Sequence, residues 1–172
     1  MDQDFSRIFI GVDPDTTTTG IAIRHPFGRF ELHLARSSGR FAEDRMLGMS
    51  RELERILGAL GAEAAAVEWQ SLRPRGEKNP NAIMMLQAVA GMATSIIHRS
   101  VPTVYRPIPA DWRGSAPKEA VQKRILELAG LTIDSEEFVH IPMSMRTHVI
   151  DALGLAIWAS QGGKKGRFPW SR

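Results

Sequence analysis

Short apolar runs rich in β-branched residues alternate with segments of helical period along this 172-residue chain. The first run, residues 7–13, is apolar almost throughout and ends at Asp13-Pro14, a pattern typical of a strand buried on both faces. Residues 20–24 and 30–34 form two further runs, and the Pro and Gly of residues 25–29 between them indicate a chain reversal. Apolar runs at 64–69 and 102–107 complete five predicted strands.

Four other segments repeat their apolar residues at the spacing of a helix. Pro80 lies in the first turn of one of them, where its missing N–H costs no hydrogen bond. Ser115 is the predicted N-cap of another, which ends at Gly130. The predicted helices cover residues 41–60, 80–97, 115–130 and about 146–160.

The element order is strand, strand, strand, helix, strand, helix, strand, helix, helix. Three hairpin-linked strands followed by helical crossovers predict an α/β fold with one mixed sheet, because each strand–helix–strand connection returns parallel to its predecessor. The first and fourth strands can then lie side by side. No repeat or long linker divides the chain, which predicts one domain over residues 1–172, with 161–172 as a basic C-terminal tail.

Two acidic residues lie at the ends of these two strands, and two further polar residues lie on the last helix. Asp13 ends the first strand, and Glu68 interrupts the apolar fourth run, where an unpaired carboxylate is costly to bury. His148 and Asp151 are three residues apart and share one face of an otherwise apolar helix. Converging carboxylates are the ligands that Mg²⁺ prefers, and a pair of such ions can promote phosphodiester hydrolysis.

Each of these four residues also has a purely structural interpretation, but such an interpretation is weaker for the four together, because all of them would have to occur in the right elements by chance. The structural alternatives are a turn cap for Asp13, a solvated edge for Glu68, a surface ion pair with Arg146 or Lys164 for Asp151, and a satisfied core position for His148.

Composition and charge limit the binding partners and the cellular compartment that we expect for this protein. The net charge is only +3, but residues 73–78 carry three basic residues and one acid, and the segment after Gly162 carries four basic residues and no acid. Such patches attract nucleic-acid phosphates. The absence of Cys excludes disulfides and thiolate metal sites, and the longest apolar run, residues 152–159, is too short for a membrane span. Residues 1–7 show no export signal, so a cytoplasmic protein is expected.

Four segments, in order, resemble the RuvC-type Holliday junction resolvases. Residues 8–23 are similar to the opening strand, Asp-Pro-Gly turn and second strand of that family, and residues 66–70 (Ala-Val-Glu-Trp-Gln) to its Glu-containing fourth strand. Residues 78–82 (Lys-Asn-Pro-Asn-Ala) resemble the start of its long central helix. Residues 148–157 resemble its final helix, where an Asp or His precedes the last Asp by three. The resemblance spans residues 8–160.

The resemblance implies an RNase H-like fold, a homodimer, and symmetric nicking of four-way DNA junctions with Mg²⁺, for which Mn²⁺ can substitute. A branch-migration helicase is a further implied partner. By position, Asp13, Glu68, His148 and Asp151 match the family's metal-binding catalytic set, and both metal binding and proton transfer stay open for His148.

Basic residues match the family's DNA contacts as well. Lys118, in Ser115-Ala-Pro-Lys118, resembles a lysine that contacts DNA near the scissile phosphate, and Arg113 resembles a second basic position just upstream. The expected DNA-contacting residues are Trp69, Leu72, Arg73, Arg75, Lys78, Arg113, Lys118 and Lys123.

The chain departs from the family's pattern at the turn after β-strand residues 7–13, after Glu-x-Gln, and in the segment between Arg113 and Lys118, which is short. Asp15 replaces the Gly of the Asp-Pro-Gly turn, which adds a carboxylate beside the site and puts the turn geometry in question. After Glu-x-Gln the family commonly carries aromatic residues that wedge into the junction, whereas this chain has Ser71 and Leu72. We expect Leu72 to wedge or Trp69 to stack on a base, with a core position as the alternative for Trp69.

Other functions share parts of this pattern. Another RNase H-like nuclease acting on nicked, branched or RNA-containing substrates would use the same metal site, and its substrate preference would distinguish it. Residues 11–20 also resemble the phosphate loop of actin-like ATPases, although that fold is normally built from a pair of such domains. A non-catalytic junction-binding protein is disfavoured because all four site positions carry competent residues.

Overall fold

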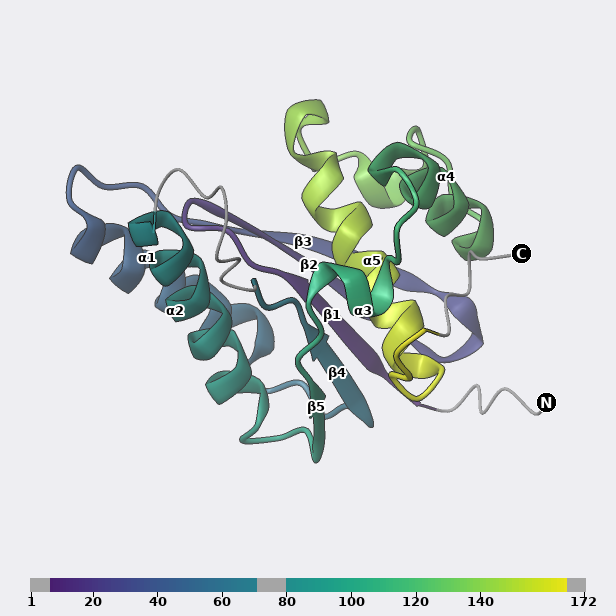
Figure 1. Ribbon diagram of the computed structural model, residues 1–172, viewed down its shortest axis with the longest axis horizontal. Coiled ribbons are helices and arrows are strands. Elements are labelled where there is room, and N and C mark those ends of the chain that lie inside the picture. Colours follow the sequence, from purple (N-terminus) through teal and green to yellow (C-terminus); the bar gives the residue numbers. More distant parts are fainter. Residues whose placement is uncertain (1–6, 71–79, 167–172) are drawn as a thin grey trace.

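The computed structural model describes residues 7–70 and 80–166, which form a sheet with helices on both faces (Figure 1). The sheet has five strands in the order β3-β2-β1-β4-β5. β2 is antiparallel to β1 and β3, whereas β4 is parallel to both β1 and β5. The predicted α/β mixed sheet is therefore confirmed. Its strands are β1 (Phe9–Asp13), β2 (Thr18–Arg24), β3 (Phe30–Arg36), β4 (Ala64–Val67) and β5 (Thr103–Tyr105).

The helices divide between the two faces of the sheet, and each face has its own hydrophobic cluster (Figure 1). One cluster lies beneath α1 and α2, and the other beneath α5, with α4 beside it. No helix in the described part of the chain is long and apolar enough to cross a membrane. The helices are α1 (Ala42–Leu57), α2 (Pro80–Ile97), α3 (Pro109–Trp112), α4 (Lys118–Ala129) and α5 (Arg146–Ser160).

Helix α5 lies directly against the backbone of β1 and β2 because both strands carry glycine at the contact. A Cβ atom at Gly11 would overlap the carbonyl oxygen of Ala152, and a Cβ atom at Gly20 would overlap that of His148. Gly20 pairs with Asp13 across the β1–β2 ladder. The first turns of α5 are thereby held over the end of β1.

The start of α4 and the existence of α3 differ from the sequence-based expectation. α4 begins at Lys118 with Pro117 at the cap position, so the predicted Ser115 cap is wrong. Proline disfavours helical geometry in the residue before it, here Ala116, so a helix capped at Ser115 cannot form. α3 has only four residues, too few to show a helical period. Gly130 does end α4, in the left-handed conformation with φ +67°.

Candidate active site

Asp13 and Glu68 lie at one edge of the sheet because β1 and β4 are parallel neighbours. Asp13 is the last residue of β1. Glu68 directly follows β4 and extends the ladder, since its N–H donates to the carbonyl oxygen of Val12 over 3.0 Å. Both acidic residues are buried, with 8% of Asp13 and 6% of Glu68 exposed.

His148 reaches the same edge from the first turn of α5. Its Nδ1 atom lies 3.0 Å from Oδ2 of Asp13. The hydrogen bond raises the pKa of His148, and burial of the ring opposes it. The close contact of α5 with Gly20 sets the height of His148 above the strand.

Asp151 lies one helical turn further along α5, and both of its carboxylate oxygens have partners. Oδ1 accepts a hydrogen bond from Nε2 of Gln122 over 2.8 Å, and Oδ2 lies 2.7 Å from Nζ of Lys118. The surface pair with Arg146 or Lys164 that the sequence allowed is therefore absent from the described residues. Arg146 donates instead to carbonyl oxygens of the chain that leads into α5.

A buried tryptophan that the sequence pattern did not single out holds Glu68. The Nε1–H group of Trp112 donates to Oε2 of Glu68 over 2.7 Å, and Nε2 of Gln70 donates to Oε1 over 2.9 Å. Trp112 is fully buried at the end of α3, and its ring occupies the space that Gly154 of α5 leaves open. The only hint in the sequence is a tryptophan between Pro109 and Lys118, which does not reveal its partner.

Burial in this site opposes the ionisation of two of its carboxyl groups, those of Asp13 and Glu68. Burial is the main cause that raises the pKa of Asp13, and the charge of Asp151 adds to it, while the hydrogen bond with His148 acts in the opposite direction. Burial and the charge of Asp13 raise the pKa of Glu68 to about 7, against the lowering effect of Trp112. An additional cation would favour the ionised forms.

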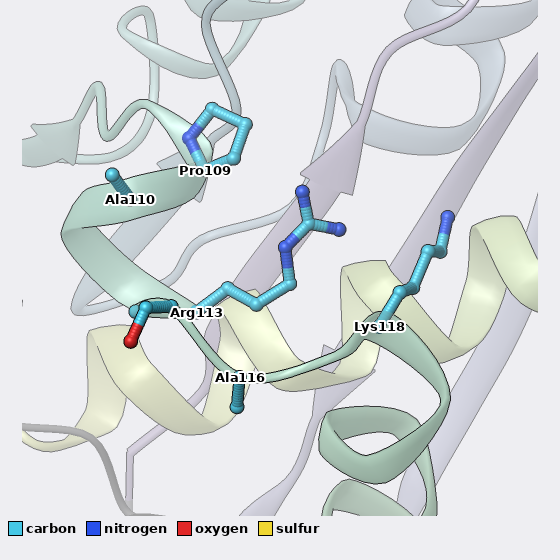
Figure 2. Close-up of a pocket in the computed structure, with 7 residues that line it drawn as sticks. Pro109, Ala110, Arg113, Ala116 and Lys118 are labelled. Atoms are coloured by element: carbon cyan, nitrogen blue, oxygen red, sulfur yellow. The ribbon is translucent and has the colours of Figure 1, made fainter.

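A cavity of about 290 Å³ is lined by Asp13, Glu68, His148 and Asp151, among other residues. A second cavity of about 280 Å³ adjoins it and shares Pro109, Arg113 and Lys118 with it. In Figure 2 the side chains of Arg113, directly after α3, and of Lys118, the first residue of α4, extend toward the same side. Two basic groups therefore stand at the border of the acidic cavity.

Asp15 lines the acidic cavity and closes the β1–β2 turn. Its Oδ1 accepts hydrogen bonds from the backbone N–H and the hydroxyl of Thr17, at 2.9 and 3.1 Å. Among the described residues other than Gly, Phe27 alone has a positive φ. The turn thus accommodates Asp15 without the left-handed conformation that favours Gly.

The remaining expected DNA contacts have different positions. Lys123 is exposed on α4. Trp69 is half-buried and packs against the cluster beneath α1 and α2, the core position considered as its alternative. The expected contacts outside the described residues are Leu72, Arg73, Arg75 and Lys78.

The donor atoms of the cavity suit a hard divalent cation. They are the carboxylate oxygens of Asp13, Glu68 and Asp151 and the imidazole of His148. Burial is the main cause that raises the pKa values of Asp13 and Glu68, and a cation bound beside them would oppose this effect by favouring the ionised forms. Within residues 7–70 and 80–166, no three such side chains already surround a common cation position. Asp151 and Asp13 are paired with Lys118 and His148 instead.

Comparisons by sequence find no protein-family model and no curated protein that matches the chain. Comparison by structure finds RuvC of Thermus thermophilus in complex with a Holliday junction substrate, with a TM-score of 0.68, 20% identity, and coverage of 92% of this chain and 98% of that one. A second T. thermophilus RuvC structure matches with a TM-score of 0.62 and 21% identity, and the match covers 92% of this chain and 98% of that one. The yeast mitochondrial Holliday junction resolvase Ydc2 matches with a TM-score of 0.54 and 11% identity, and the match covers 91% of this chain and 82% of that one.

The similarity extends over nearly the whole of this chain and of both RuvC chains. It covers the mixed sheet and the helices on both of its faces, including the last helix, which crosses β1 and β2. The chain therefore has the RNase H-like fold of the RuvC-type Holliday junction resolvases.

Proposed function

We propose that this protein is a Mg²⁺-dependent endodeoxyribonuclease that resolves four-way DNA junctions by paired symmetric nicks. One observation carries the proposal: Asp13, Glu68 and Asp151 are buried around one cavity at the ends of two parallel strands, with His148 beside them. The T. thermophilus RuvC that shares this fold has a Holliday junction as its substrate. Buried carboxylates in a cavity bordered by basic groups suit a reaction at a phosphodiester.

Asp13, Glu68, His148 and Asp151 would hold the metal ions, and Mn²⁺ would substitute for Mg²⁺. Bound there, divalent cations lower the pKa of water and stabilise the leaving oxygen of a phosphodiester. His148 has a second role open to it, because its imidazole can accept or release a proton near neutral pH. The 3.0 Å contact with Asp13 orients the ring for either role.

The basic residues would bind and position the DNA backbone. Arg113 and Lys118 border the cavity, and Lys118 would exchange its contact with Asp151 for a phosphate oxygen when the site fills. Further along the DNA, the expected contacts are Lys123 and, as predicted from the sequence alone, Leu72, Arg73, Arg75 and Lys78.

Paired nicks require two active sites, which a homodimer would provide. Helix α2 carries no charged side chain. One side of it is nevertheless exposed, and 63% of Met84 on that side is accessible to solvent. An uncharged exposed helix face of this kind fits a second copy of the same surface. A branch-migration helicase as partner and a cytoplasmic location remain predictions from the sequence.

The test uses a synthetic four-way junction and, for comparison, linear, nicked and RNA–DNA hybrid duplexes of matched sequence, each with Mg²⁺ or with EDTA. Mapping of labelled strands is expected to show paired nicks on the junction alone, only with the metal. Cleavage mainly of the nicked or hybrid duplex would instead establish the other RNase H-like nuclease. ATP binding without cleavage would favour the actin-like alternative.

Two variants locate the activity. Asp13→Asn should abolish cleavage but retain junction binding, because it removes a metal ligand and lowers the repulsion of phosphate. Asp134→Asn, an exposed acid before α5, is the control and should cut like the unmodified protein. Cleavage by the Asp13→Asn variant would show that the site is assigned wrongly.

A further inference from the structure

A second group of basic and aromatic side chains lies at the active-site end of the sheet, on the side away from α4. It consists of Arg36, the last residue of β3, and of Arg40 and Phe41 in the segment that leads into α1. All three side chains are exposed. We call these three residues the β3–α1 surface.

The register of the sheet relates Arg36 to the acidic cavity. Arg36 pairs with Thr18, at the start of β2, and Ser37 donates its N–H to the carbonyl oxygen of Thr17 over 3.1 Å. Thr17 belongs to the turn that follows Asp13, and Thr18 is the first residue of β2 after that turn. β3 is two strands away from β1, which is about 10 Å measured across the strands. Arg36 lies two residues further along β3 than the position that is level with Asp13.

The alternation of side chains places Arg36 on the same face of the sheet as the site. Phe30 and Leu32 of β3 join the hydrophobic cluster beneath α5, so Arg36, in the same phase, belongs to that face. Asp13 reaches that face too, because it contacts His148 of α5. Arg36 and the catalytic carboxylates therefore share both an end and a face of the sheet.

The charges of this surface are available for a ligand. Within residues 7–70 and 80–166, no carboxylate lies at ion-pair distance from Arg36 or Arg40. Nη1 of Arg45 donates to the carbonyl oxygen of Gly39 over 3.0 Å and holds the segment in place. The guanidinium of Arg40 lies 5.6 Å from the ring centre of Phe41, which is 59% exposed.

We propose that the β3–α1 surface is a second DNA-binding element, which holds an arm of the junction on the side of the cavity opposite Arg113 and Lys118. Arg36 and Arg40 bind backbone phosphates, and the exposed ring of Phe41 packs against a base that the branch point leaves unstacked. The inference rests on the proposed function and adds a contact that the resemblance to resolvases did not supply.

The test measures the dissociation constant of a four-way junction between 50 and 200 mM salt, with Ca²⁺ in place of Mg²⁺ to prevent cleavage, for the double variant R36Q/R40Q. Loss of two phosphate contacts is expected to weaken binding about tenfold and to reduce the slope of log affinity against log salt by about 2. The double variant R36K/R40K keeps the charges and should retain the slope. Thermal unfolding verifies that each variant folds.

The control double variant R29Q/R51Q removes the same charge elsewhere: Arg29 precedes β3 at the far end of that strand, and Arg51 lies on α1. It should bind junctions and nick them like the unmodified protein. If R36Q/R40Q matches this control in affinity and slope, the inference is wrong while the proposed function stands. If the unmodified protein neither binds nor cuts junctions, the proposed function itself fails.

Discussion

At the scale of single residues, the indole of Trp112 favours the ionised form of Glu68. A hydrogen bond donated to the charged form of a carboxylate lowers its pKa, and the 2.7 Å contact does so against the effect of burial. The ring keeps its place because it packs against Gly154, where a Cβ atom would lie 2.8 Å from it. Trp112 is a positioning residue, since it acts through Glu68.

Trp112→Phe is expected to weaken Mn²⁺ binding about tenfold at pH 7, with recovery near pH 9. The variant keeps an aromatic ring but removes the donor, so the pKa of Glu68 rises further and the carboxylate stays protonated when the metal needs it ionised. Electron paramagnetic resonance of free Mn²⁺ measures the affinity. Trp158→Phe is the matched control: that tryptophan is also buried, but its Nε1 atom has no hydrogen-bond partner among the described residues. Equal losses in both variants would contradict the role of the indole.

The metal-free protein is expected to lose stability as pH rises from 5.5 to 7.5. The pKa of Glu68 is about 7 in the folded chain against 4.5 unfolded, so between these values the folded state binds more protons. The contribution of Glu68 to the free energy of unfolding is fully present at low pH and is lost as the pH rises through the folded pKa. The loss between pH 5.5 and 7.5 is about 2 kcal/mol. The raised pKa values of Asp13 and His148 act in the same direction.

Urea unfolding in EDTA at the two pH values, compared with Glu68→Gln, measures this difference. The variant lacks the titrating carboxyl and should lose about 2 kcal/mol less over the interval than the unmodified protein. A parallel pH response of the two proteins would exclude Glu68 as its source. Mg²⁺ should stabilise the unmodified protein more at pH 7.5 than at pH 5.5, because the ion binds the ionised form.

At the scale of elements, the contact of α5 with β1 and β2 determines where two site residues stand. Gly20→Ala would place a methyl group against the carbonyl oxygen of His148, and backbone cannot move aside as a side chain can. We expect a loss of about 3 kcal/mol in the free energy of unfolding and a displaced His148. Chemical denaturation measures the first effect and metal affinity the second. Gly61→Ala, with no atom within 4 Å of the new Cβ, should change neither.

The elements that the sequence predicts well are those with a strong local signal. Residues 146–160 coincide with α5, and Ile97 ends α2 as predicted, because apolar residues recur at helical spacing there. The mixed sheet follows from strand order alone, since crossover connections return parallel. The approach of Asp13 to Glu68 follows from that topology.

Contacts between distant segments give no local signal, and these are what the sequence could not supply. Trp112 and Glu68 are 44 positions apart in the chain. The ion pair of Lys118 with Asp151 depends on the docking of α4 beside α5, which no spacing in either segment reveals. The cap at Ser115 failed for a local reason, because Pro117 disfavours helical geometry at Ala116.

At the scale of the whole molecule, the sheet separates two hydrophobic clusters, and each of them lies beneath a different surface of the protein. The cluster beneath α5 supports the side chains of the site, and the cluster beneath α1 and α2 supports the proposed dimer surface. Substitutions on the outer side of α2 should therefore affect assembly without disturbing the chemistry of one site.

Met84→Lys is expected to dissociate the proposed dimer, because two added charges would face each other across a two-fold axis. Sedimentation should show a monomer, and junctions should receive single unpaired nicks. Leu128→Lys, a similar change at a 44% exposed position of α4, is the control and should leave the assembly unchanged. An unmodified protein that sediments as a monomer would overturn the dimer proposal.

The ion pair between Lys118 and Asp151 has a thermodynamic consequence. Because an ammonium group already neutralises Asp151, a metal ion entering there takes part in an exchange rather than a simple addition. The exchange is easier when the ammonium group has another anion to go to, and a DNA phosphate is such an anion. By linkage, metal would then promote DNA binding as much as DNA promotes metal binding. A site built in this way would bind metal weakly until DNA is present.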